Sequence, residues 1–156
     1  MNPRTILLSA TLLCLATALA ACGSGSSLAF ATSANRVCTA YYNKAYALPP
    51  PIGVRQLAAY PEKQQVLREQ ELSKLQVLTP PAAERGAYTR YLSDMAALDD
   101  LYASAIANIK MPHSASVQTL IRQAQGLRAR LTTQAQALGL TECTKNPYTA
   151  THYATS

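Results

Sequence analysis

The two histidines are the first side chains to consider for metal or general-base chemistry. His113 and His152 have no partner at the Glu-x-x-His or His-x-x-x-His spacing that places two ligands on one helix face. The chain also has no G-x-S-x-G or S-x-x-K motif and no glycine-rich phosphate loop. We therefore expect a protein that is not an enzyme, without a metal site or cofactor.

Carboxylates are the next candidates for acid–base chemistry. Asp99 and Asp100 form the only adjacent pair. Neighbouring residues on a helix point about 100° apart, so these two do not make a catalytic dyad by themselves. Like Glu69 and Glu71, they are expected to solvate the exposed face of a helix.

Cys22 ends an apolar segment that follows a short positive start at Arg4. The segment Ile6 to Ala21 has 16 residues and finishes in small side chains, which is the layout of a signal peptide. A membrane-spanning helix needs about 20 apolar residues. The pattern therefore predicts export rather than a permanent membrane span.

The tetrapeptide Leu19-Ala20-Ala21-Cys22 resembles the lipobox of bacterial lipoproteins. The resemblance implies that Cys22 receives a diacylglyceryl thioether and becomes the N-terminal residue after cleavage. Two acyl chains would give stable membrane attachment, where one gives only marginal binding. Two alternatives remain open, which are ordinary secretory cleavage after Ala18 or Ala20 and an uncleaved anchor.

These features divide the chain into four parts and place the protein outside the cytoplasm, attached to the cell membrane by its lipid. The part that remains after cleavage suits one domain. The expected parts are a cleaved signal peptide, a flexible lipid-anchored linker, a helical domain and a loosely ordered tail, at 1–21, 22–31, 32–143 and 144–156.

The charge balance and the remaining cysteines narrow the partners. The formal net charge is +6, but Arg122, Arg128 and Arg130 do not line one helix face, so nucleic acid is not an expected partner. Cys38 and Cys143 are the two cysteines left after processing. Outside the cytoplasm, an isolated pair without a C-x-x-C motif predicts a disulfide.

Apolar residues recur at helical spacing in four segments separated by prolines. Pro61 either begins the second helix or kinks a longer one; we favour a short turn at 54–59 before it. Gly139 is placed to end the last helix. The expected helices are 32–48, 61–78, 81–110 and 114–138.

Short connectors predict an all-α, antiparallel up-down-up-down four-helix bundle whose first helix is short. With an even number of helices, the start of the first and the end of the last share one end of the bundle. Cys38 and Cys143 can then meet, whereas three helices would separate them. The disulfide would close a loop of about 100 residues and stabilise the bundle by roughly 4–5 kcal/mol.

The chain has nine tyrosines, one phenylalanine and no tryptophan. Most of these rings are expected in the core with their hydroxyls at the surface. The alternative is a groove between the first and third helices that binds a glycan, a peptide or a small apolar ligand. The tyrosines that would form it are Tyr41, Tyr42, Tyr88, Tyr91 and Tyr102.

Three short motifs in the mature part are similar to those of small uncharacterised lipoproteins of high-GC Gram-positive-type bacteria. They are Ala34-Asn35-x-x-Cys38, Leu78-Thr79-Pro80-Pro81 and Leu138-Gly139-Leu140-x-x-Cys143. The resemblance implies no activity. We expect a non-enzymatic interaction or accessory module whose partner is an envelope protein or a glycan. The alternative is a ligand-binding lipoprotein that uses the tyrosine groove.

Overall fold

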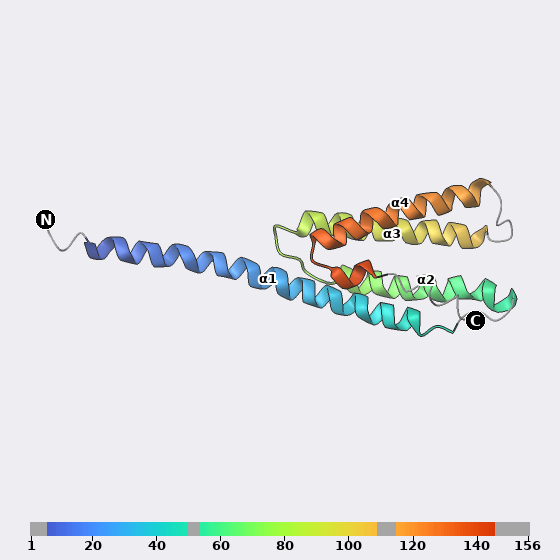
Figure 1. Cartoon of the computed structure of the whole chain (residues 1–156), viewed down its shortest axis with the longest axis horizontal. Helices are drawn as coiled ribbons and strands as arrows, with labels where there is room; N and C mark the ends of the chain where they lie inside the picture. Colours follow the sequence, from blue (N-terminus) through green and yellow to red (C-terminus); the bar gives the residue numbers. More distant parts are fainter. Residues whose placement is uncertain (1–5, 50–53, 109–114, 146–156) are drawn as a thin grey trace.

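The computed structural model describes residues 6–49, 54–108 and 115–145, and the described residues form helices without any strand. The protein is all-α, as predicted (Figure 1). A short 3₁₀ helix, η1, follows the last of four α-helices. The helices are α1 (Ile6–Tyr46), α2 (Val54–Gln76), α3 (Arg85–Ala107), α4 (Ala115–Ala137) and η1 (Thr141–Thr144).

The first helix is not short, which corrects that part of the prediction. α1 has 41 residues, continues through the Gly/Ser segment and extends well beyond the other helices in Figure 1. Its contact with the bundle begins before Thr32, because Phe30 is buried together with Ala34 and Cys38. These three residues are spaced four apart, so they share one face of the helix. The lone phenylalanine, overlooked as a core residue, marks where this packing starts.

The second helix is continuous through Pro61, so the alternative of one longer helix fits better than a separate turn. α4 ends at Ala137, and the chain turns away from the helix at Gly139, as predicted. The φ of Gly139 is 70°. The amide of Leu140 donates to the carbonyl of Ala135 at 2.8 Å, and the amide of Gly139 donates to that of Gln136 at 3.0 Å. This pair of bonds is a Schellman motif, and it turns the chain toward η1.

Packing follows the chain order. α1 lies against α2, α2 against α3 and α3 against α4, while η1 contacts both α1 and α4. Successive helices run back and forth along the long axis of Figure 1, which is compatible with the predicted up-down-up-down order. Within the described residues the backbones of α1 and α4 do not approach each other closely. η1 bridges them instead.

The core has two parts. The larger cluster joins all four helices and includes Phe30, Leu75, Tyr88, Ala135 and Leu140. The smaller one joins α3 and α4 through Leu98, Ala124 and Leu127. None of the described helices is apolar over a stretch long enough to cross a bilayer.

Candidate functional site

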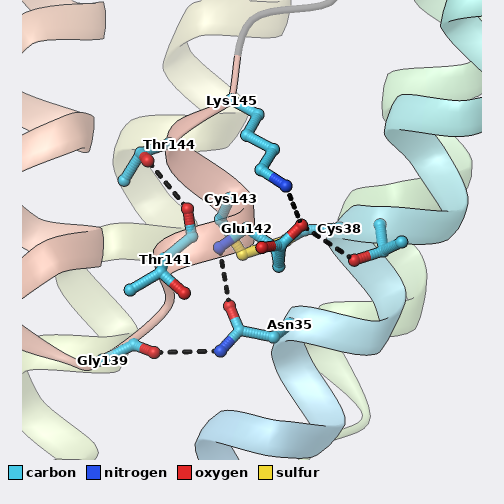
Figure 2. Close-up of polar contacts among 9 residues, drawn as sticks. Asn35, Cys38, Gly139, Thr141, Glu142, Cys143, Thr144 and Lys145 are labelled. Carbon is cyan, nitrogen blue, oxygen red and sulfur yellow. Dashed lines mark hydrogen bonds and ion pairs between the residues drawn. A yellow bond between two sulfur atoms is a disulfide. The ribbon is translucent and has the colours of Figure 1, made fainter.

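The predicted disulfide is present and fastens η1 to α1. Cys38 and Cys143 are bonded, and their Cα atoms are 5.0 Å apart. Beside the bond, the side-chain amide of Asn35 donates to the carbonyl of Gly139 at 3.0 Å and accepts from the amide of Glu142 at 2.9 Å (Figure 2). The Asn-x-x-Cys spacing thus places both groups on the face of α1 that meets the end of the chain.

Glu142 makes two further polar contacts near the disulfide. Its carboxylate accepts a hydrogen bond from the Thr39 hydroxyl at 3.2 Å and forms an ion pair with Lys145 at 2.6 Å. Lys145 holds the pKa of this carboxyl below its ordinary value, and the Thr39 bond acts in the same direction. Figure 2 shows the Lys145 side chain reaching back toward Glu142. The segment from Gly139 to Lys145, which includes η1, is therefore held against α1 by several bonds.

Next to the disulfide lies a cavity of about 210 Å³ that is partly open to solvent and to which all four helices and η1 contribute. Its walls combine aromatic, apolar and ionisable side chains. The cavity is smaller than the roughly 300–1,000 Å³ of sites for drug-sized ligands, so only a small ligand would fit. The residues that we use to define it are Tyr41, Arg68, Glu71, Tyr91, Met95, Leu98, Asp99, Tyr102, Arg128, Thr132, Glu142 and Lys145.

Glu71 is the most unusual residue of this cavity. Only 8% of its surface is exposed, and no hydrogen bond to its carboxyl from another described residue is present. Burial, reinforced by the charge of Asp99 and opposed by that of Arg68, raises its pKa to about 8. At neutral pH the side chain is therefore mainly a neutral acid.

Tyr91 faces the cavity beside Glu71. Burial raises the pKa of its hydroxyl, and the nearby Glu71 charge raises it further. Like the Glu71 carboxyl, this hydroxyl has no hydrogen bond to another described residue. Both groups face the cavity, where water or a ligand can form hydrogen bonds with them.

A pair of charges near Glu71 also lines the cavity. Arg68 Nε donates to Asp99 Oδ1 at 2.8 Å, with side chains only 12% and 13% exposed. The Arg68 guanidinium also lies 4.4 Å from the centre of the Tyr102 ring, a cation–π contact. Arg128 approaches the same ring from α4 at 5.8 Å.

These observations correct the prediction for two of the four acidic residues considered. Glu71 and Asp99 are not on a solvated face, whereas Glu69 and Asp100 are exposed as expected. The signal for Glu71 was its spacing, four residues after Leu67 and four before Leu75, which puts it on the apolar stripe of α2. Because the residue is a glutamate, it was predicted to lie on the exposed face of the helix instead.

The five tyrosines proposed for a groove do not all line the same cavity. Tyr41, Tyr91 and Tyr102 line the cavity. Tyr88 lies in the core, where its hydroxyl donates to the Leu75 carbonyl at 2.8 Å and burial raises its pKa to about 12. Tyr42 stacks on Tyr46 at 5.9 Å, outside the cavity lining.

The described residues give little or no information on the remaining predicted sites. His113, His152 and the tail from residue 146 lie outside the described residues. Cys22 falls within α1, and its lipidation stays a prediction, as does the division at residues 21 and 31. Within the described part of the chain, no three His, Cys, Asp or Glu residues are grouped as a metal site would require.

Comparisons of the chain with protein-family models, with curated proteins and with solved structures find no match. The resemblance to bacterial lipoproteins therefore rests on the motifs alone.

Proposed function

We propose that this protein is a lipid-anchored, extracytoplasmic binding protein that holds a small molecule in the cavity beside its disulfide. The observation that supports binding is the cavity itself, which contains an acid and a phenol without partners among the described residues. Buried polar groups normally have hydrogen-bond partners. A ligand is one way to supply them, and it would not require any reaction.

The lipid anchor rests on Leu19-Ala20-Ala21-Cys22 and is proposed from the sequence. The helical path of α1 is consistent with it. Phe30 lies eight residues after Cys22, about 12 Å along a helix, and Tyr41 lies about 28 Å away. An anchor at Cys22 would therefore leave the cavity well outside the membrane and accessible from the cell envelope.

We propose no enzymatic role. Glu71 and Asp99 share the cavity, but Asp99 is already held in an ion pair with Arg68. A reaction that needs two available carboxylates therefore lacks the second one.

An interaction module is the second candidate, because two large apolar side chains are exposed near the end of the bundle closest to Cys22. Leu28 is 70% exposed and Val77 is 79% exposed. Each lies two residues along the chain from a core residue, Phe30 on α1 and Leu75 on α2, and these two core residues pack in the same cluster. An envelope protein or a glycan could bind there without using the cavity.

The anchor is tested by the intact mass of the protein extracted from its own membrane. We expect residues 22–156 carrying a diacylglyceryl group. A water-soluble product, or a different first residue, would contradict the proposal.

Ligand binding is tested by native mass spectrometry of the same extracted protein. We expect a co-purifying small molecule in the wild type. Thr132→Leu would fill part of the cavity and should lose it, whereas Thr133→Leu, on the exposed face of the same helix turn, should retain it. Equal retention by Thr132→Leu would argue against the cavity, and absence of any small molecule from the wild type would argue against ligand binding.

A further inference from the structure

The ionisable groups of the cavity wall define what kind of ligand it can accept. Arg68 is paired with Asp99, and Lys145 is paired with Glu142. Beside these pairs, the carboxyl of Glu71 and the hydroxyl of Tyr91 lie close together and have no hydrogen bond from another described residue. A ligand is therefore expected to bring a group that complements an acid next to a phenol.

We propose that the cavity binds a small primary ammonium compound, with its nitrogen paired to the Glu71 carboxylate and its carbon chain against the apolar wall. This inference rests on the proposed binding function and names the ligand class. An ammonium has three N–H donors and no acceptor, so it can bond to the carboxylate and to the Tyr91 oxygen together.

The rest of the wall fits such a ligand. Rings of Tyr41, Tyr91 and Tyr102 line the cavity, and aromatic faces attract cations within about 6 Å of their centres. Met95 and Leu98 supply apolar surface for a short alkyl chain. An anionic ligand would gain no ion pair from the neutral Glu71 acid and would be repelled by the Asp99 carboxylate.

The protonation state of Glu71 couples this binding to pH. Its pKa is about 8 in the empty cavity, so an ammonium would bind the minor, ionised form at pH 7 and release a proton. The charged groups that share its environment are Arg68 on its own helix, Asp99 on α3, Arg128 on α4, and the Glu142–Lys145 pair beside η1. The alkylammonium itself stays charged until about pH 10.

The fraction of ionised Glu71 sets the size of the effect. With a pKa of about 8, apparent affinity should rise roughly fivefold between pH 7 and pH 8, and roughly tenfold between pH 7 and pH 9. Calorimetry in buffers with different ionisation enthalpies should show close to one proton released per ligand at pH 7.

The test is titration calorimetry of the extracted full protein in neutral detergent micelles, with empty micelles subtracted. The probes are 1-aminobutane, 1-butanol and butyrate, which share a carbon chain and differ in charge. We expect 1-aminobutane to bind more tightly than either other probe. Glu71→Gln should weaken it at least tenfold and remove the pH dependence.

Glu69→Gln is the matched control, because Glu69 is two residues away on α2, exposed, and outside the cavity wall. It makes the same side-chain replacement and should leave binding unaltered. Equal binding of 1-aminobutane by wild type and Glu71→Gln would overturn the inference. Preferential binding of butanol or butyrate would overturn it too, while leaving the binding function standing. If no probe binds the wild type and no molecule co-purifies with it, both proposals fail.

Discussion

Replacing Glu71 with glutamine should stabilise the protein at neutral pH, because it removes a carboxyl that is costly to ionise in the folded state. The pKa of Glu71 is about 8 when folded, against an ordinary value of 4.5. Between these values the unfolded chain binds fewer protons than the folded one. The free energy of unfolding therefore falls as pH rises through this window, by up to about 1.4 kcal/mol per pH unit.

The expected magnitude follows from the width of that window. At pH 7 the wild type should be roughly 3 kcal/mol less stable, through this group alone, than at pH 4.5. Glutamine has nearly the same shape and does not titrate. Glu71→Gln should therefore match the wild type near pH 4.5 and exceed its stability by about 3 kcal/mol at pH 7, with no further gain above about pH 8.

Urea unfolding of both proteins in steps of one pH unit from 4.5 to 9, followed by circular dichroism with the disulfide intact, measures this difference. All other titrating groups are shared, so they cancel in it. Glu69→Gln should give a difference that hardly changes with pH. A difference for Glu71→Gln that is equally independent of pH would refute the idea that Glu71 ionises with difficulty.

Three further predictions concern the framework around the cavity. Leu98→Ala should lower the free energy of unfolding by roughly 2–5 kcal/mol, whereas Asp100→Ala, at an exposed position, should change it by less than about 0.5 kcal/mol. Equal losses in urea titrations would mean that the buried face of α3 is assigned wrongly. Replacing Cys38 and Cys143 together by alanine should cost roughly 4–5 kcal/mol, because their 105-residue separation leaves a long loop unconstrained, and an unchanged urea midpoint would contradict this. The hydrogen bonds from α4 lower the pKa of Asp94. The wild type should therefore be more stable than Asp94→Asn above the ordinary carboxyl pKa and should lose this advantage as the pH falls below it. A stability advantage that persists in acid would exclude this contribution.

The architecture could be predicted because its signals are local and repeated. Apolar residues at helical spacing indicated four helices, and prolines and Gly139 marked most of their ends. The disulfide was predicted because Cys38 and Cys143 are an isolated pair in a chain with an export signal, and it agreed with an even number of antiparallel helices. The start of the first helix was predicted too late, at residue 32, because glycines and serines precede it. Phe30 is already buried with Ala34 and Cys38.

The cavity could not be predicted because it depends on contacts between helices that are far apart in sequence. Arg68 meets Asp99 across 31 residues, and neither has a local pattern that reveals the pairing. Composition pointed the wrong way for Glu71, since a helix rich in Glu, Lys and Gln normally has these residues in water. Tyrosines were recognised as unusual, but only the packed helices distinguish Tyr91 in the cavity from Tyr88 in the core.

The bundle could have closed over this space with apolar side chains. Position 71 lies on the apolar stripe of α2, where a leucine would pack without any ionisation cost, and the Glu71 acid should lower stability by roughly 3 kcal/mol at pH 7. The disulfide and the Asn35 and Glu142 bonds hold η1 against α1, beside the cavity. A destabilising acid within a reinforced frame is the arrangement expected when a ligand, rather than the fold alone, determines the residue at that position.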